Sequence, residues 1–338
     1  MEPRRRANLI GQDGAERTLI DAARSGRLAH AWLIAGPKGV GKATLAFRFA
    51  RWLLAGAPVS LDGSMALDPA DRAFRLAAAG SHPDLVTVER TAGEGGRVRG
   101  EIVVDDVRAA GAFLRLTPAM AGWRVVVVDA ADDMNPNAAN ALLKVLEEPP
   151  ARAVLLLVAH APARLLPTLR SRCRRLDLRP LSEAGVLAVL REIVADPEET
   201  RALASLADGS PGRALAFAEA GGLELYREID ALAGRLPALD LEAVHDLAER
   251  WTRRGAEETW RTGLDLLRTW LERAVLATVG DAQRPEDARL PRHPRGLDGW
   301  VEVWEKVGRL TRQADSLRLD RKFVVIAAFS ALAEAARG

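Results

Sequence analysis

The chain has 338 residues, of which 48% are hydrophobic and 28% charged, so it is long enough for two or three globular domains. Its formal net charge of +2 does not by itself indicate nucleic-acid binding. A single cysteine, Cys173, excludes an internal disulfide and a multi-cysteine metal site, and the five histidines lie too far apart for a metal motif. Because the sequence contains neither a run of about 20 apolar residues nor the apolar core of a signal peptide, we expect a cytoplasmic protein with no membrane partner.

Short apolar runs alternate with helical patterns through the first half of the chain, which is typical of a parallel sheet covered by helices. We expect strands at residues 31–35, 85–88, 124–128, 154–158 and 174–178. Two of these runs are almost continuously aliphatic, as in strands that are buried on both faces. Residues 91–100 contain four glycines and are expected to form a loop rather than a phosphate-binding turn, because no helical pattern follows them directly.

The strand pattern ends at about Leu181, and helical patterns continue to the C-terminus with an interruption at residues 208–212. In the last third, apolar residues recur at a spacing of three and four. They form two stripes, Leu264, Leu267, Leu271 and Val275, then Trp300, Trp304, Val307, Leu310, Ala314 and Leu317. Five of the eight tryptophans lie in this region, and we expect them to fill the core of a helical bundle rather than to form an interfacial stripe.

A glycine-rich motif at residues 36–44, Gly-Pro-Lys-Gly-Val-Gly-Lys-Ala-Thr, follows the first expected strand and opens a helical pattern. This is the context of a phosphate-binding P-loop, in which backbone N–H groups and a helix N-terminus favour anions. Lys42 takes the position of the lysine that meets the β- and γ-phosphates. The full motif continues with Ser or Thr, whose hydroxyl holds magnesium, but this chain has Ala43. Thr44 is rotated by about 100° around the helix and is a poor substitute.

A second motif of such sites follows the strand at residues 124–128. Asp129 is placed to hold magnesium through water, but the glutamate that follows it in active ATPases is replaced by Ala130. Because a positioned general base accounts for about 10²–10⁴ in rate, we favour a retained scaffold over an active ATPase. Nucleotide binding without turnover stays open, and its candidate residues are Gly36, Gly39, Gly41, Lys42, Thr44 and Asp129.

Several motifs, taken in chain order, carry a resemblance to a known family. They are residues 9–12 (Leu-Ile-Gly-Gln), 30–33 (His-Ala-Trp-Leu), the P-loop, 137–150 (a helix ended by two prolines), 166–173 with its Ser-Arg-Cys, 209–213 and 317–322. Together they resemble the AAA+ clamp-loader family of bacterial DNA polymerase III. The resemblance extends over nearly the whole chain, although the last third matches mainly by pattern.

The resemblance implies an α/β fold with three domains: an AAA+ P-loop domain with a parallel sheet at residues 1–179, a small helical lid domain at 180–222 and an all-α collar domain for oligomerisation at 223–338. Within the family, the loss of the P-loop hydroxyl and of the catalytic glutamate points to the delta-prime type rather than to the gamma/tau motor. Many members carry a four-cysteine zinc module, but residues 57–82 contain no cysteine, so no zinc is expected.

The resemblance also implies a role for Arg172 of the Ser-Arg-Cys motif. In a ring of AAA+ subunits this arginine reaches the γ-phosphate bound to the neighbouring subunit, for which a planar and always charged guanidinium is suited. Without the motif, a solvated or phosphate-facing cluster with Arg170, Arg174 and Arg175 would be the simpler interpretation. Arg213 occupies the position of a sensor arginine, but the usual polar first sensor is replaced by Ala159-His160, so Arg213 is a weak candidate.

Three functions follow from these observations. The first is a delta-prime-type subunit of the clamp loader, with gamma/tau and delta subunits as partners and the sliding clamp and primed DNA reached through the complex. It would have no intrinsic ATPase and no required cofactor, and would act within the DNA-directed DNA polymerase holoenzyme. The second is an active, gamma/tau-like ATPase that uses Thr44 and another acid. The third is a free DNA-binding protein that uses its arginines, whose binding would be weak and steeply salt-dependent.

Overall fold

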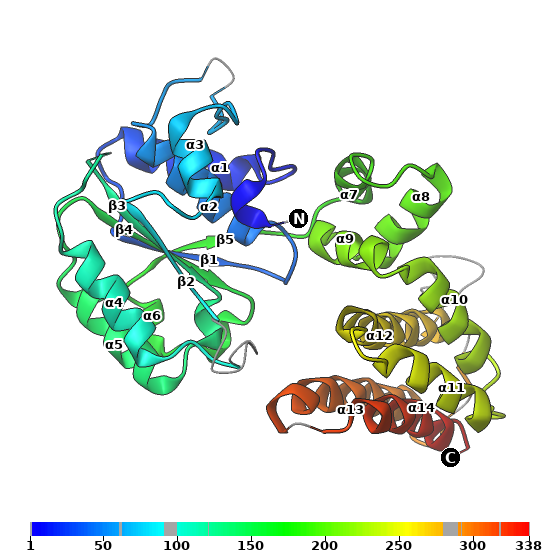
Figure 1. Cartoon of the computed structure of the whole chain (residues 1–338). Helices are drawn as coiled ribbons and strands as arrows, with labels where there is room; N and C mark the ends of the chain where they lie inside the picture. Colours follow the sequence, from blue (N-terminus) through cyan, green and yellow to red (C-terminus); the bar gives the residue numbers. More distant parts are fainter. Residues whose placement is uncertain are drawn as a thin grey trace. The chain divides into compact units, whose positions relative to one another are not determined.

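The computed structural model describes residues 2–60, 63–90, 100–120, 122–279, 290–291, 293–317 and 319–337. The described residues form two compact units (Figure 1). The first comprises Met1–Val189 with Asp208–Gly212, and the second comprises Leu190–Ala207 with Arg213–Gly338. The three domains expected at residues 1–179, 180–222 and 223–338 stay a prediction.

The described part of the first unit is built on a five-stranded parallel sheet with the strand order β2-β3-β4-β1-β5. The strands are β1 (Ala31–Ala35), β2 (Leu85–Glu89), β3 (Arg124–Asp129), β4 (Ala153–Ala159) and β5 (Arg174–Asp177). All five strands predicted from the sequence are confirmed, with ends that differ by at most one or two residues. The parallel α/β fold class is confirmed with them.

Side chains of the sheet alternate between two apolar cores, as the two-residue period of a strand requires. Along β4, which is buried throughout, Val154, Leu156 and Val158 enter one core, whereas Leu155 and Leu157 enter the other. The first core also contains residues of α1 (Asp13–Arg24), α2 (Lys42–Leu54) and α3 (Arg72–Ala78), and the second those of α4 (Val104–Leu114), α5 (Pro136–Glu147) and α6 (Pro167–Arg170). Short 3-10 turns occur at Pro3–Arg5, Ala131–Asp133 and Pro162–Arg164.

The start of α4 corrects one expectation. The sequence suggested no helix directly after residues 91–100, yet α4 begins at Val104. Its first turn is stabilised because the carboxylate of Asp106 accepts a hydrogen bond of 3.2 Å from the backbone N–H of Val103. The sequence did not indicate this start because two valines precede the two aspartates of the first turn. The loop predicted at residues 91–100 lies almost entirely outside the described residues.

Every described element after β5 is a helix, as expected. These are α7 (Glu183–Leu190), α8 (Pro197–Leu206), α9 (Pro211–Glu219), α10 (Gly222–Ala233), α11 (Leu241–Thr252), α12 (Glu257–Val279), α13 (Gly296–Leu317) and α14 (Arg321–Arg337). Four of the five C-terminal tryptophans are at most 2% exposed, namely Trp251, Trp260, Trp270 and Trp300. They fill the core of the helical unit, as predicted. Among the described residues, no helix is long and apolar enough to cross a membrane.

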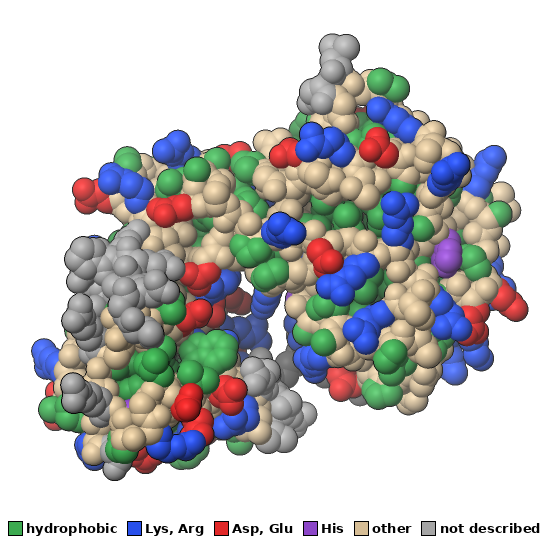
Figure 2. All heavy atoms as spheres, turned by 180° about the vertical axis from the view of Figure 1, so that it is seen from behind, with side chains coloured by type: hydrophobic (Ala, Val, Ile, Leu, Met, Phe, Trp, Pro, Cys, Tyr) green, Lys and Arg blue, Asp and Glu red, His purple; other side chains and the backbone are tan. Residues whose placement is uncertain are grey.

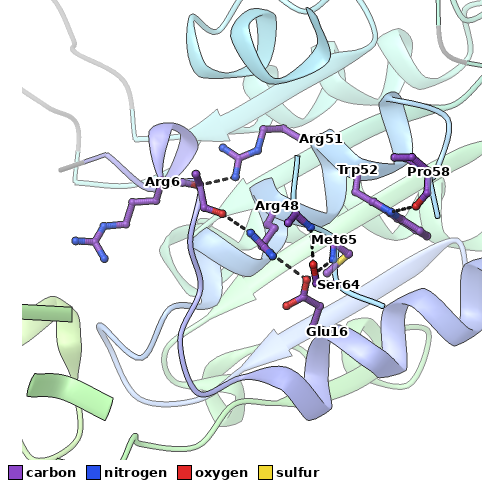
Figure 3. Close-up of polar contacts among 10 residues, drawn as sticks. Arg6, Glu16, Arg48, Arg51, Trp52, Pro58, Ser64 and Met65 are labelled. Carbon is purple, nitrogen blue, oxygen red and sulfur yellow. Dashed lines mark hydrogen bonds and ion pairs between the residues drawn. The ribbon is translucent and has the colours of Figure 1, made fainter. Parts of the chain in front are cut away.

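A buried cluster of charged side chains contacts the described part of residues 57–82, the segment noted above for its lack of cysteine (Figure 3). Arg48 of α2 donates a 3.0 Å hydrogen bond to Glu16 of α1, and both side chains are less than 10% exposed. The same carboxylate oxygen of Glu16 accepts the backbone N–H of Met65 at 2.5 Å. Arg48 also donates to the carbonyl of Ala7. One ion pair therefore joins α1, α2, the N-terminal segment and the loop before α3.

A second arginine of α2 extends this cluster. Arg51 is 1% exposed, donates 2.6 Å hydrogen bonds to the carbonyls of Arg4 and Arg6, and lies 4.3 Å above the ring of Phe74 in α3. Burial, followed by the nearby positive charge of Arg48, lowers the pKa of Arg51 to about 10. Among the described residues no group of three or more metal-ligating side chains is arranged around a common point. Arginine-centred contacts hold the described part of this segment.

Replacing Glu16 by Gln keeps the size of the side chain but leaves Arg48 buried without its counter-charge. Breaking a buried pair in this way costs about 3–5 kcal/mol. We expect the unfolding free energy of α1 and α2 to fall by that order, as measured by hydrogen exchange of their amides. Asp105→Asn, which breaks an ion pair with Arg108 whose side chains are 82% and 71% exposed, should change it by less than about 1 kcal/mol. Equal effects of the two substitutions would contradict a buried role for Glu16.

Candidate functional site

The P-loop connects β1 to α2 at the carboxyl edge of the sheet. Gly36 has φ +145°, and a Cβ at this position would lie 2.4 Å from the carbonyl oxygen of Leu178. Gly39 and Gly41 also have positive φ, and Gly41 caps the helix that begins at Lys42. These positions require glycine because a side chain would clash or be strained. The loop therefore enters a helix N-terminus with the geometry that favours a bound anion.

Neighbouring segments hold three consecutive carbonyls of this loop. The donors are Ser210 Oγ to Lys38 at 2.9 Å, Gly212 N to Gly39 at 2.8 Å and Gln12 Nε2 to Val40 at 3.2 Å. A Cβ at position 212 would lie 2.7 Å from the Cα of Gly39, which explains the second glycine of the Gly-Ser-Pro-Gly motif at 209–212. Carbonyls bonded to neighbours are not turned toward an anion, so these contacts favour a loop whose N–H groups remain for phosphate.

Lys42 is directed into the loop itself. Its Nζ donates hydrogen bonds of 2.7 and 2.5 Å to the carbonyls of Gly36 and Pro37, and the side chain is 3% exposed. Burial lowers the pKa of Lys42 to about 8, although the negative charges of Asp129 and Asp132 oppose this shift. The ammonium group is thus held by the loop's own backbone.

Asp129 ends β3, beside Glu89 in the register of β2 and β3. Burial, followed by the nearby charge of Glu89, raises the pKa of Asp129 to about 6, although the charge of Lys42 opposes this shift. The structure thus brings the P-loop lysine and this carboxylate into the same electrostatic environment, as their motifs predicted. Whether these residues bind nucleotide stays a prediction.

The positions that lack oxygen ligands are apolar in three dimensions as well. Ala43 packs against the first core, and Ala130 is 3% exposed. Thr44, the residue offered by the sequence as a substitute, is 7% exposed in the first turn of α2. The two motif positions that would carry a hydroxyl and a carboxylate therefore present only methyl groups.

Two polar residues near Lys42, Asp132 and His160, were not predicted from the sequence to contact each other. The carboxylate of Asp132 accepts the backbone N–H groups of His160 and Ala161 at 2.9 and 3.0 Å, and so joins the end of β3 to the end of β4. Burial, followed by the positive charge of Lys42, lowers the pKa of His160 to about 4. The imidazole is therefore neutral at physiological pH. The spacing of Asp129 and Asp132 could suggest a second carboxylate here, but not which amides it binds.

Arg172 lies on the turn after α6, on a different part of the first unit. Its two terminal nitrogens donate to the carbonyl of Thr168 at 3.0 Å and to the carboxylate of Glu147 at 2.9 Å, and its side chain is 36% exposed. The hydroxyl of Ser171 also donates to the carbonyl of Thr168, at 3.1 Å. Cys173 packs against the second core, and burial raises the pKa of its thiol to about 12. The turn is thus anchored at Cys173 and exposes the arginine.

Arg213 contacts residues of the helical unit. Its Nε donates to the carboxylate of Asp265 at 2.9 Å, and a terminal nitrogen donates to the hydroxyl of Thr269 at 2.7 Å, both on α12. Its guanidinium also lies 5.3 Å from the centre of the Phe217 ring. These contacts support the packing role suggested from the sequence.

The substitution Asp129→Asn tests how much the buried, ionised carboxylate of Asp129 destabilises the folded state. The pKa of Asp129 rises from 3.8 to about 6 on folding. The folded state therefore binds this proton more tightly than the unfolded state does. The resulting stabilisation of the fold is present at low pH and is lost as the pH rises through about 6. We expect Asp129→Asn to raise the unfolding free energy at pH 7.5 by about 1–3 kcal/mol relative to the unsubstituted chain, and to change it little near pH 4. A difference between the two proteins that does not vary with pH, measured by urea denaturation, would contradict this.

Comparison with known proteins identifies the family. Residues 11–182, more than half of the chain, match the family model described as "DNA polymerase III, delta subunit". A Pseudomonas aeruginosa DNA polymerase III subunit delta' is 40% identical over 185 residues, which cover 54% of each chain. The Escherichia coli subunit delta' is 35% identical over 224 residues, covering 66% of this chain and 64% of that one.

A gamma/tau subunit of Mycobacterium tuberculosis is less similar, at 28% identity over 346 residues that cover 91% of this chain and 56% of the relative. The match to the two delta' relatives spans about half to two thirds of their length. The motif positions discussed above, from the P-loop to Ser171-Arg172-Cys173, lie within the residues that match the family model. The chain belongs to the delta-prime family of DNA polymerase III clamp-loader subunits.

Proposed function

We propose that the chain acts as a delta-prime-type subunit of a DNA polymerase III clamp loader, with a degenerate ATP site of its own and with Arg172 supplied to the site of a neighbouring subunit. The observation that carries the proposal is a contrast between two places in the first unit. The chain's own P-loop lacks the hydroxyl and the general base, whereas an arginine stands exposed on an anchored turn elsewhere.

The chemistry of the degenerate site supports a scaffold rather than a motor. ATP hydrolysis needs a magnesium ligand next to the P-loop lysine and a base that polarises the attacking water, and Ala43 and Ala130 offer neither group. Lys42 is satisfied by backbone carbonyls of its own loop. Gly36, Gly39, Gly41, Lys42, Thr44 and Asp129 would then form, at most, a pocket that binds ATP or ADP without turnover.

Several features support action in trans. Arg172 lies at the surface on a turn, and the next residue, Cys173, is partly buried and packs against the second core. A guanidinium held in this way can place several N–H donors on the oxygens of a γ-phosphate. The relatives named above are subunits of DNA polymerase III. The proposed partners are therefore gamma/tau and delta subunits, with residues 223–338 as the collar that joins them and with the sliding clamp and primed DNA as the targets of the complex.

A basic surface is not required for this role. Figure 2 shows positive and negative side chains interspersed over the face in view, which agrees with a formal net charge of +2. The proposal thus assigns Arg172 to a single phosphate at an interface, and not to a field of arginines that attracts DNA.

The isolated chain should show no ATP turnover above a blank, because loss of the general base alone lowers the rate by about 10²–10⁴. Phosphate release by the purified chain, with and without primed DNA, measures this. Turnover that disappears in Lys42→Ala would instead favour the gamma/tau-like ATPase.

In the assembled complex, Arg172→Ala should slow hydrolysis at the neighbouring site by as much as about 10³–10⁵, and clamp loading should fall with it. ATP turnover and clamp loading by the complex reconstituted with gamma/tau and delta subunits measure this, after complex formation has been checked by mass. The control is Arg175→Ala, which removes an exposed arginine three residues away that pairs with Asp177. Normal clamp loading with Arg172→Ala, or an equal loss with both variants, would refute the assignment.

A further inference from the structure

The contact between Arg172 and Glu147 joins two segments that are 25 residues apart in the sequence. Glu147 is the last residue of α5, and Arg172 follows α6. The guanidinium of Arg172 bridges the carboxylate of Glu147 and the carbonyl of Thr168, at 2.9 and 3.0 Å. By contrast, the neighbouring Arg175 pairs with Asp177 on its own strand.

Both anchors stand on elements with fixed positions. Leu142, Val145 and Leu146 of α5 are buried in the second core, and the helix stops before Pro149. Thr168 belongs to α6, whose Leu169 is fully buried. The carboxylate and the carbonyl therefore define a fixed direction for the guanidinium that lies between them.

The two anchors leave donors for a further ligand. A guanidinium carries five N–H groups in a rigid fork, and the structure gives Arg172 two hydrogen bonds to described residues. Three of its N–H groups have no partner among the residues that the structure describes. An arginine that is oriented by the chain's own residues can thus still donate to phosphate oxygens.

The ion pair contributes little to the stability of the fold. Its side chains are 36% and 51% exposed, and solvent screens pairs of this kind so strongly that many have no measurable effect on folding. An arginine free in solvent would instead sample many rotamers, which must be lost when it meets a phosphate. The main effect of the ion pair is therefore to orient the guanidinium of Arg172.

We infer that Glu147 is a positioning residue that orients Arg172 before the neighbouring subunit's nucleotide is engaged. The inference rests on the proposed function of Arg172. Removal of the carboxylate should lower the rate of hydrolysis in trans and leave nucleotide affinity, complex formation and thermal stability unchanged.

The test uses the complex reconstituted with gamma/tau and delta subunits and compares Glu147→Ala, Arg172→Ala and the double variant. Glu147→Ala should lower the Arg172-dependent part of kcat for ATP hydrolysis by about five- to twentyfold. This factor corresponds to the rotamer entropy that an unrestrained arginine must lose. The KM for ATP should not change. Glu147→Gln, which keeps an oxygen acceptor, should restore most of the rate.

Glu148→Ala is the matched control, because this adjacent exposed carboxylate has no side-chain hydrogen bond or ion pair to the described residues. It should behave as the unsubstituted chain, and the double variant should be no slower than Arg172→Ala. A normal or raised rate with Glu147→Ala, or a double variant slower than Arg172→Ala alone, would overturn the positioning role. If Arg172→Ala itself has no effect, the proposed function fails instead.

Discussion

The position of β4 between β1 and β3 is the constraint on which the site depends. β4 pairs with β1 over residues 155–159 and with β3 over residues 153–158, and all of its residues are buried. Because the strands are parallel, the ends of β1, β4 and β3 meet at one edge of the sheet, and the P-loop, His160 and Asp129 follow from them. The carboxylate of Asp132 then ties the end of β3 to the residues after β4.

The P-loop is also a packing element of the fold. Three of its carbonyls accept hydrogen bonds from residues 12, 210 and 212, and its glycines allow close approaches of neighbouring backbone. None of these contacts needs the hydroxyl or the carboxylate lost at Ala43 and Ala130. Hydrolytic groups can therefore disappear while the loop keeps its shape, since the fold uses its backbone and catalysis would use its side chains.

Buried charged side chains also contact the described part of residues 57–82, which contain no cysteine. A buried pair between Glu16 and Arg48, with Arg51 beside it, links the N-terminal segment to the loop before α3. Local sequence offers no sign of this cluster, because its members come from four separate parts of the chain. A charged residue in an amphipathic helix such as α2 is expected at the surface, and only packing shows that these two arginines are inside.

The strands, the helical second half, the buried tryptophans and the lack of an oxygen ligand at Ala43 and Ala130 could be predicted from the sequence, because periodicity and motif spacing are local properties. The sequence also singled out Arg172 through the Ser-Arg-Cys motif. The surroundings of that arginine and of the P-loop lysine could not be predicted in this way. Glu147, Asp132 and Ser210 reach their partners across 25, 28 and 172 residues. Such contacts depend on how the elements pack, and no local pattern encodes the pairing.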